Sequence, residues 1–321
     1  MKVRIGTFNA ENLFARFRFK GVRERYQKPD GRRGYRYRPY SPQELQDVVK
    51  DGWTVDKTRF KPFREQNRQL TAQAMKAIKA DILGLQEIEG MDTLKRFISA
   101  FLGRHGYTYK ALIDGNDPRL IDVALLSTYP LAYIRTHQFE RTRGGRSFVF
   151  SRDCLEVGIQ LSRHTVLPVF VNHFKSMVGG RARTMARRKV QAEAVRRILQ
   201  DRFGNDPGTA AWVVLGDLND YLPSAGLEPL LGQPWVENVV GRLPEHERWT
   251  HYYDGRREYR QLDYLLLSKA LARANPKAVP AIERRGMPRR ATRYTGPRFD
   301  GVGQNDPKAS DHCPTVIEIN I

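Results

Sequence analysis

The segment 212–220, with the sequence WVVLGDLND, is the stretch that decides the fold. It opens with an apolar run of the length of a buried strand, and polar residues stand directly after that run. These polar residues are Asp217, Asn219 and Asp220. In α/β proteins, groups at such a strand end are presented to a ligand. The segment therefore predicts a buried strand that carries acidic and amide side chains into a functional site.

The same combination of an apolar run and polar end residues recurs along the chain. The further runs are residues 3–8 followed by Asn9 and Glu11, residues 82–86 followed by Glu87, residues 166–172 followed by His173, and residues 315–321 preceded by Asp311 and His312. Oxygen ligands without thiolates suit a hard divalent cation such as Mg²⁺ or Mn²⁺ better than zinc. Histidine can donate a proton to a leaving oxygen or accept one from water near neutral pH. The pattern predicts metal-assisted phosphoryl chemistry.

The chain is strongly basic, with 55 Lys and Arg against 35 Asp and Glu and a net charge of +20. Positive charge of this size attracts polyanions and releases their counterions, so nucleic acid leads as a partner and an anionic membrane surface comes second. A solvated basic surface without a partner is the alternative. Residues 16–40 interleave arginine with tyrosine and phenylalanine. This composition predicts a long loop that contacts phosphates and bases, or an ordinary insertion anchored by its aromatic residues.

Strands and helices mix along the whole chain, and no linker rich in Gly or Ser divides it. Apolar periodicity predicts strands at residues 3–8, 81–87, 121–127, 154–161, 166–172, 211–216, 261–268 and 315–321. It predicts helices after Pro62, over 91–102 and over 181–203, the last with a basic outer face of Arg183, Arg187, Arg188, Arg196 and Arg197. We therefore expect an α/β protein with one domain over residues 1–321 and a basic, aromatic-rich insertion around 16–40.

Cysteine content and hydropathy exclude several classes of protein. Cys154 and Cys313 are too few for a scaffold built on disulfides, and they cannot complete a structural zinc site alone. No window approaches the roughly 18 consecutive apolar residues that a membrane span needs. The first strand-like run begins at Val3, without the regions of a signal peptide before it. We expect a cytoplasmic protein without stable membrane insertion, and secretion only if the N-terminus was trimmed.

Seven sequence blocks, taken in order, resemble the endonuclease/exonuclease/phosphatase superfamily, which has the DNase I-like fold. The blocks are FNAEN at 8–12, LQE at 85–87, DVALLS at 122–127, NHFKS at 172–176, GDLN at 216–219, LDY at 262–264 and SDH at 310–312. They extend over nearly the whole chain, and the first and fourth are most similar to bacterial nuclease-type members. The resemblance implies an α+β fold, a four-layer α-β-β-α sandwich with two packed mixed β-sheets.

The resemblance also implies roles for individual residues. The positions that match metal-binding positions of the family are Asn9, Glu87 and Asp311, with Glu11 assisting. Those that match catalytic positions are Asp217 and Asn219, which orient the attacking water or a phosphate oxygen, and the acid–histidine pairs Asp263 with His312 and Asp122 with His173. Those that match or adjoin substrate-contacting positions are Arg152, Arg119, Lys175 and again Asn219. Which histidine is the acid and which the base is left open by the sequence.

Three functions compete on these observations. The leading hypothesis is a Mg²⁺- or Mn²⁺-dependent nuclease, an endonuclease first, that hydrolyses phosphodiester bonds of DNA, or alternatively of RNA, by direct attack of water. It would contact phosphates without regard to sequence. The second is a lipid or small-molecule phosphoesterase, sphingomyelinase-like or inositol-phosphatase-like, with the same catalytic residues. The third is a nucleic-acid-binding module that lost catalysis, and the intact set of acidic residues and histidines argues against it.

Overall fold

Two six-stranded β-sheets form the centre of the protein. The structure is a computed structural model that describes residues 1–13, 22–27, 33–38, 65–103, 106–117, 119 and 121–321. The chain divides into two compact units, one made of residues 1–13 and 65–321 and the other of residues 14–64. Each unit is described by itself below. The expectation of a single domain over residues 1–321 stays a prediction.

Both sheets of the larger unit are mixed. The first has the strand order β15 (Ala281–Ile282), β16 (Thr315–Asn320), β1 (Lys2–Leu13), β4 (Ile82–Ile88), β6 (Asp122–Ser127) and β5 (Tyr109–Leu112). The second has the order β11 (Val236–Asn238), β14 (Asp263–Ser268), β10 (Val213–Asp217), β9 (Thr165–His173), β8 (Leu155–Ser162) and β7 (Leu131–Arg135). In these sheets β1 runs parallel to β4 and β9 parallel to β10, and the other named neighbours are antiparallel.

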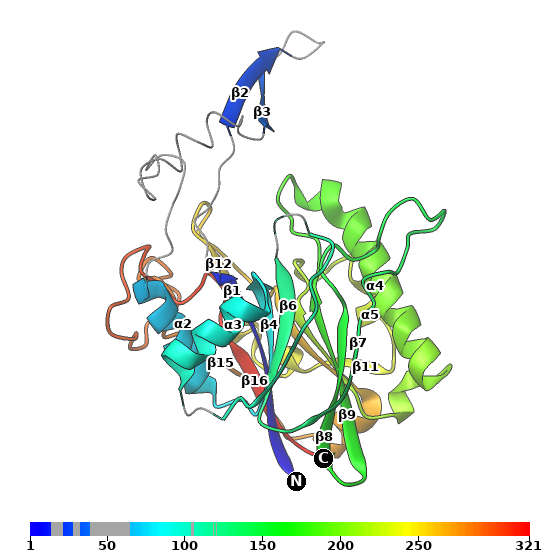
Figure 1. Cartoon of the computed structure of the whole chain (residues 1–321). Coiled ribbons are helices and arrows are strands. Elements are labelled where there is room, and N and C mark those ends of the chain that lie inside the picture. Colours follow the sequence, from blue (N-terminus) through cyan, green and yellow to red (C-terminus); the bar gives the residue numbers. More distant parts are fainter. Residues whose placement is uncertain (14–21, 28–32, 39–64, 104–105, 118, 120) are drawn as a thin grey trace. The chain divides into compact units, whose positions relative to one another are not determined.

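Helices cover the outer face of each sheet, as Figure 1 shows. Helix α2 (Glu65–Ile78), helix α3 (Met91–Phe97) and the π-helical turn Ile98–Leu102 lie over the first sheet, and helices α4 (Arg181–Phe203) and α5 (Glu228–Leu231) lie over the second. The other helices and strands described in this unit are helix α6 (Lys269–Ala274), the hairpin of β12 (His251–Tyr253) and β13 (Glu258–Arg260), and the 3₁₀ turns Pro207–Thr209, Val239–Arg242 and Glu245–Glu247. The expected four-layer sandwich is confirmed.

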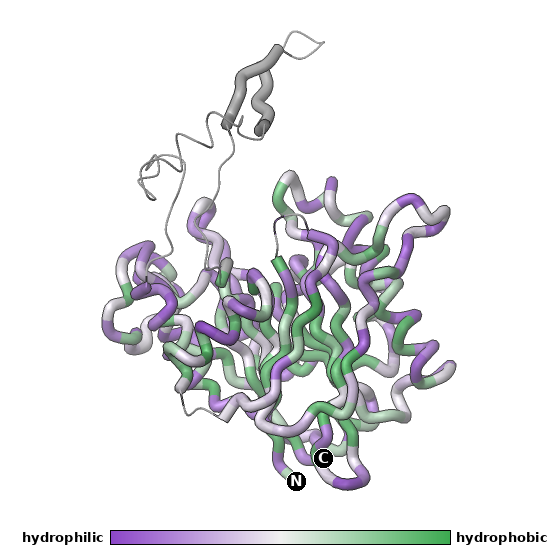
Figure 2. The backbone as a smooth tube through the Cα atoms, in the orientation of Figure 1, coloured by the Kyte–Doolittle hydropathy of each residue, from purple (hydrophilic) through white to green (hydrophobic). Residues whose placement is uncertain are grey.

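Three apolar clusters hold the layers together. One lies between the sheets and includes Ile5, Val123, Val171 and Leu265, while the others pack α2 and α3 on the first sheet and α4 on the second. A strand that is covered on both faces must be apolar on both, which explains the continuous apolar runs of the sequence. Figure 2 shows the result as green along the central strands and purple mainly on loops and on parts of the helices.

The segment predicted as a long loop contains two paired strands. Strands β2 (Val22–Gln27) and β3 (Arg33–Arg38) are antiparallel, with Val22 opposite Arg38 and Gln27 opposite Arg33. The sequence pattern favours this pairing, because arginine and tyrosine alternate in RGYRYR with the period of a strand. Residues 14–21, 28–32 and 39–64 lie outside the described residues. The prediction of a loop over residues 16–40 is therefore corrected to strands only at β2 and β3.

Two further expectations concern cysteines and membranes. Cys154 and Cys313 are both free and buried, in agreement with the absence of a disulfide scaffold. Among the helices that the structure describes, none has the length and hydropathy that crossing a bilayer would need.

Gly216 in β10 provides a test of how tightly the second sheet is packed. Its φ is +136°, and a Cβ there would stand 1.9 Å from the carbonyl oxygen of Asn172 in β9. Substitution by alanine should therefore lower the free energy of unfolding by about 3 kcal/mol, through backbone strain and overpacking. Gly241→Ala is the matched control, because a Cβ added at that position would meet nothing within 4 Å. Denaturant unfolding should show a change within about 0.5 kcal/mol for that control. Equal stability of the two variants would contradict the packing described.

Candidate active site

The predicted site residues meet at one edge of the two sheets. Because β1 and β4 are parallel, Asn9 and Glu87 both lie toward the carboxyl ends of their strands. In the second sheet, parallel pairing sets His173 of β9 opposite Asp217 of β10. Antiparallel β14 starts at the same edge, so Asp263 also stands opposite Asp217. The topology thus gathers residues that are far apart in the sequence.

Irregular backbone aims the acidic side chains into this site. Five described non-glycine residues have positive φ, and three of them are the predicted site residues Glu11 (47°), Glu87 (64°) and Asn219 (53°). In β4 the register shifts between Gln86 and Ile88, which marks a β-bulge at Glu87. Regular alternation after Leu83 and Leu85 would point Glu87 toward the helices, and the bulge instead turns it toward the second sheet.

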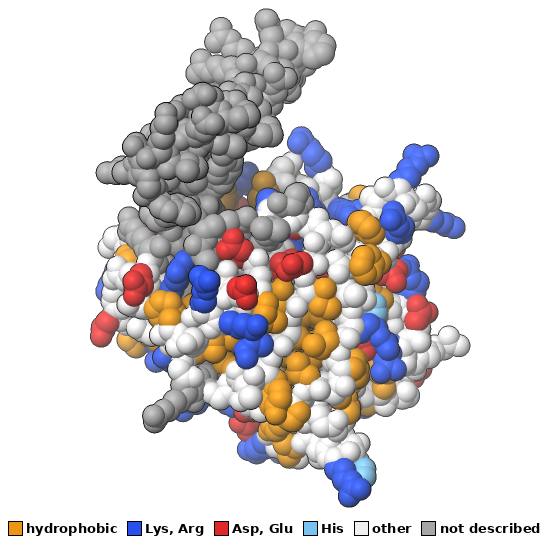
Figure 3. Space-filling model, viewed as in Figure 1, with side chains coloured by type: hydrophobic (Ala, Val, Ile, Leu, Met, Phe, Trp, Pro, Cys, Tyr) orange, Lys and Arg blue, Asp and Glu red, His pale blue; other side chains and the backbone are white. Residues whose placement is uncertain are grey.

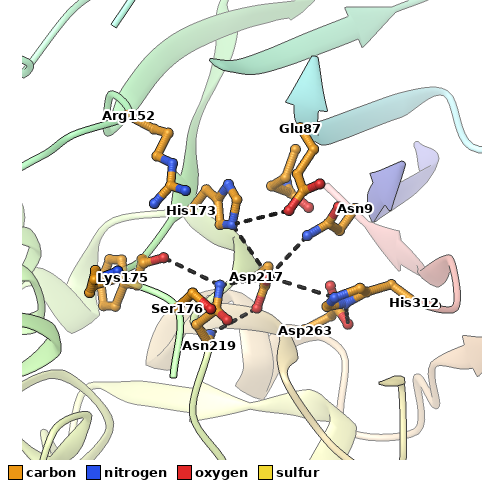
Figure 4. A network of polar contacts seen from close by, with 12 residues as sticks. Asn9, Glu87, Arg152, His173, Lys175, Ser176, Asp217, Asn219, Asp263 and His312 are labelled. Atoms are coloured by element: carbon orange, nitrogen blue, oxygen red, sulfur yellow. Dashed lines mark hydrogen bonds and ion pairs between the residues drawn. The ribbon is translucent and has the colours of Figure 1, made fainter. Parts of the chain in front are cut away.

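Asp217 is the centre of the hydrogen-bond network, as Figure 4 shows. Its Oδ2 accepts from Asn9 Nδ2 at 3.0 Å and from Asn219 Nδ2 at 2.8 Å, and its Oδ1 accepts from the Asn219 backbone N–H at 2.8 Å. The Nε2 atoms of His173 and His312 lie 3.5 Å and 3.8 Å from the same Oδ2. Burial, opposed by His312 and assisted by the charge of Asp263, raises the pKa of Asp217 to about 7. The carboxyl group can therefore exchange a proton near neutral pH.

His312 and Asp263 form the acid–histidine pair that the resemblance implied. His312 Nδ1 and Asp263 Oδ2 are 2.8 Å apart, and both side chains are buried. Burial alone would lower the pKa of His312, but the negative charges of Asp263 and Asp217 outweigh it and raise that pKa well above its usual value. The geometry thus favours a protonated His312 whose Nε2 faces the site.

The implied pair of His173 and Asp122 is absent. Asp122 is buried and accepts a hydrogen bond from the Gly115 backbone N–H at 2.8 Å, while His173 Nδ1 has no hydrogen-bond partner within the described part of the chain. His173 Nε2 instead faces Asp217 and Glu87, the latter at 3.9 Å. Burial, with the positive charges of Arg152 and His312, lowers the pKa of His173 well below its usual value, so this imidazole is neutral. The two histidines therefore differ in charge.

Acidic side chains cluster on the side of the first sheet. Burial and the nearby charge of Asp311 raise the pKa of Glu87, and they raise that of Glu11 to about 7. Both oxygens of Glu11 are engaged, Oε1 with Lys308 Nζ at 2.7 Å and Oε2 with the Asp311 backbone N–H at 2.8 Å. Asn9 Oδ1 accepts from the Glu11 backbone N–H at 3.0 Å.

This acidic cluster fits a divalent cation. Glu87 and Asp311 are the carboxylates that could hold such an ion, since both oxygens of Glu11 are already bound by Lys308 and by the Asp311 backbone N–H. His251, Lys308 and His312 outweigh burial and hold the pKa of Asp311 below its ordinary range, so this group is ionised. Burial and then repulsion by Asp311 raise the pKa of Glu87, and a cation would oppose both effects. The donors are oxygens, which Mg²⁺ and Mn²⁺ prefer.

Basic side chains lie on the opposite side of the site. Arg152 is buried, with its Nε 3.1 Å from Asp117 Oδ2. Its positive charge acts to lower the pKa of Glu87, and the negative charges of Glu87 and Asp217 act to raise the pKa of Arg152. Arg119 is exposed and binds Asp117 through Nε and Nη2 at 3.0 Å and 2.7 Å. Burial and the charges of Arg152 and Arg119 lower the pKa of Lys175. The three predicted substrate-contacting cations are therefore neighbours.

His251 is a residue of this site that sequence reasoning missed. Its Nε2 lies 3.7 Å from Asp311 Oδ2, and its ring centroid is 4.6 Å from that of His312. Pairing of residues 250–252 with 311–313 brings it here, through hydrogen bonds from the Tyr252 N–H to the Asp311 carbonyl and from the Cys313 N–H to the Thr250 carbonyl. No local pattern in the sequence encodes this long-range contact.

Arg188 corrects the predicted basic face of α4. It is fully buried and donates to Asp220 Oδ2 at 2.9 Å, to the Lys175 carbonyl at 3.2 Å and to Thr184 Oγ1 at 2.7 Å. Asp220 Oδ1 also accepts from Arg181 Nε at 2.6 Å. The sequence suggested an outward arginine because its neighbours in the helix are basic, whereas the buried carboxylate of Asp220 requires a cationic partner. The pair ties α4 to the ends of β9 and β10.

The sequence comparisons give one family. The pattern of the Endonuclease/Exonuclease/phosphatase family matches residues 14–312 of the chain. No curated protein sequence matches it.

Solved structures of low sequence identity share the fold. Truncated TDP2 from Caenorhabditis elegans has a TM-score of 0.58 at 13% identity, with 100% of this chain and 98% of that chain covered. The human Nocturnin catalytic domain with bound sulfate has a TM-score of 0.59 at 14% identity, with 99% and 94% covered. An endonuclease/exonuclease/phosphatase family protein from Bacteroides thetaiotaomicron has 0.58 at 13%, with 99% and 98% covered. These similarities concern the fold.

The Arg188–Asp220 pair predicts a specific dependence of stability on pH. Arg181, Ser224 and Arg188 outweigh burial and lower the pKa of Asp220. A carboxyl group whose pKa is lower in the folded state stabilises the protein above its unfolded pKa, near 3.9, and this stabilisation is lost as the pH falls through the folded pKa. Asp220→Asn should therefore cost about 3 kcal/mol at pH 7 and progressively less below pH 4.

Denaturant unfolding at several pH values checks this prediction. Asp201→Asn is the control, since Asp201 is exposed in the last turn of α4. It should change stability by no more than about 0.5 kcal/mol at pH 7. A cost of Asp220→Asn that is the same at pH 7 and pH 3 would show that the carboxylate charge does not contribute.

Proposed function

Because this chain belongs to the endonuclease/exonuclease/phosphatase family, whose members act on phosphoesters, we propose that it is a divalent-metal-dependent nuclease that hydrolyses phosphodiester bonds of DNA. RNA is the alternative nucleic acid, and internal cleavage by direct attack of water is the proposed reaction. The observation that carries the proposal is the buried Asp217 carboxyl group. Its Oδ2 lies 3.5 Å from the neutral imidazole of His173 and 3.8 Å from the protonated imidazole of His312.

Glu87 and Asp311 would hold the metal ion, with Asn9 and Glu11 positioning them. Glu11 accepts the Asp311 backbone N–H and so fixes the loop that carries Asp311. Asn9 joins the cluster to Asp217 through its amide nitrogen. A bound Mg²⁺ or Mn²⁺ would stabilise the negative charge that develops on the phosphoryl oxygens.

His312 and Asp217 would carry out the proton transfers. Protonated His312, oriented by Asp263, would donate its Nε2 proton to the leaving oxygen. Asp217, with its pKa near 7, would accept a proton from the attacking water, and Asn219 would help to orient that water. Neutral His173 would accept or donate a hydrogen bond at the phosphate without adding charge. This assignment makes His312 the acid and Asp217 the base.

Positive charge around the site supports a nucleic-acid substrate. Arg152, Arg119 and Lys175 would contact the phosphate groups on either side of the scissile bond. Beyond them, Arg183 and Arg197 of α4 are exposed, and Figure 3 shows Lys and Arg side chains over this helix and the loops beside it. With a net charge of +20, a sequence-independent grip on a phosphate backbone is the favoured mode of binding.

Glu87→Gln tests the metal assignment and the activity together. Loss of this carboxylate should lower plasmid cleavage at saturating Mg²⁺ or Mn²⁺ by at least about 100-fold, because the metal supplies several kcal/mol of transition-state stabilisation. Glu228→Gln is the matched control, since Glu228 is exposed on α5. It should cleave at the wild-type rate, and EDTA should stop both enzymes. Undiminished cleavage by Glu87→Gln would refute the metal assignment.

The substrate is tested in parallel with supercoiled plasmid, end-labelled RNA and vesicles that contain sphingomyelin or phosphoinositides. Cleavage of plasmid to open circles supports the proposed nuclease. Cleavage of RNA alone would make RNA, in place of DNA, the substrate. Release of phosphocholine or inositol phosphate without any cleavage of nucleic acid would overturn the proposal in favour of a lipid phosphoesterase.

A further inference from the structure

A second group of metal-ligating atoms includes Asp311 of the acidic cluster and two histidines beside it. His251 Nε2 is 3.7 Å from Asp311 Oδ2, and His312 Nε2 is 3.9 Å from Asp311 Oδ1. One ligand atom from each of these residues can be chosen so that all lie within 4.8 Å of one another. The group therefore joins two imidazole nitrogens to one carboxylate, whereas Glu87 and Glu11 provide oxygen alone.

We propose that His251, Asp311 and His312 form a binding site for Zn²⁺ or a similar transition-metal ion, which shares Asp311 with the acidic cluster, and that its occupation inhibits the enzyme. Zinc commonly takes three protein ligands of this kind and leaves its fourth position to water. With metal–ligand distances near 2.0–2.1 Å, tetrahedral ligand atoms lie roughly 3.4 Å apart. The separations of 3.7 Å and 3.9 Å from Asp311 need to contract by about 0.3 Å and 0.5 Å, and the group as a whole, which lies within 4.8 Å, would close by movement of its side chains. Mg²⁺ prefers oxygen and does not compete well for the two nitrogens.

The surroundings of His312 resemble those of a zinc-binding histidine. Asp263, which is fully buried, lies 2.8 Å from His312 Nδ1 through its Oδ2 and so leaves Nε2 free to point at the other ligands. A carboxylate on the far nitrogen fixes the ring orientation and increases the basicity of a ligating histidine. Backbone hydrogen bonds from Tyr252 to Asp311 and from Cys313 to Thr250 hold the two ligand-bearing segments together. The ligands are therefore already arranged before an ion binds.

A zinc ion in this site would occupy His312 Nε2, the atom that is proposed to act on the substrate. The lone pair of Nε2 would form the bond to zinc, and the proton carried by that nitrogen would pass to solvent. With Nε2 bound to zinc, the imidazole could no longer reach the leaving oxygen. This inhibitory consequence depends on the proposed function, whereas zinc binding does not.

Zinc affinity, measured by competition with a chromophoric chelator at saturating Mg²⁺, tests the site without any assay of activity. The wild-type protein should bind one zinc ion that Mg²⁺ does not displace. His251→Asn should weaken that binding by at least about tenfold, because it removes a direct ligand. His246→Asn is the matched control, since it removes an exposed imidazole elsewhere on the surface and should leave the affinity unchanged. Equal affinity of wild type and His251→Asn, or complete displacement by Mg²⁺, would overturn the site.

X-ray absorption of zinc bound to the unmodified protein keeps the proposal testable if His251→Asn does not fold. Two imidazole ligands are expected, and a shell of oxygen ligands alone would overturn the site. Inhibition is tested separately by plasmid cleavage in Mg²⁺ with and without zinc. Undiminished cleavage by a zinc-saturated enzyme would refute inhibition, and a protein that cleaves no nucleic acid at all would refute the proposed function while the binding titration still decides the site.

Discussion

The architecture of the site depends on the need to satisfy one buried carboxylate. Asp217 is 1% exposed, and a buried carboxylate is costly unless hydrogen bonds and opposite charges surround it. Asn9 provides one of those hydrogen bonds from the first sheet, and Asn219 provides two from the loop after β10. The imidazoles of His173 and His312 complete its surroundings. The same contacts that stabilise Asp217 therefore fix the distance between the two sheets at the edge where the site lies.

The site also concentrates unfavourable features that the rest of the fold must stabilise. Glu11, Glu87 and Asn219 have positive φ, His173 Nδ1 and Asp263 Oδ1 lack hydrogen-bond partners in the described structure, and burial raises the pKa of several carboxyl groups. Strain and unsatisfied groups of this kind are typical of functional sites. Three apolar clusters and the buried Arg188–Asp220 pair offset that cost and hold the strand ends in place.

The sequence predicted the features of the fold and the site that depend on local pattern. It did not predict those that depend on contacts between residues far apart in the chain. Strands with apolar runs and the helix at 181–203 follow from periodicity, and the polar strand ends around Asp217 and Glu87 from their positions after those runs. Periodicity does not reveal that β12 pairs with the segment before β16, so His251 was missed. It does not show which arginine of α4 turns inward to Asp220, or that Asp122 binds the Gly115 backbone rather than His173. These outcomes depend on which buried group finds which partner.

The most direct measurement of the central claim is an anomalous difference map from crystals soaked in Mn²⁺. The account predicts a peak at the acidic cluster, with oxygens of Glu87 and Asp311 at distances of roughly 2.1–2.3 Å and the Asp217 network intact beside it. Absence of manganese from this cluster at saturating concentration, or a peak bound only by residues elsewhere in the chain, would contradict a metal-dependent reaction at the edge of these two sheets.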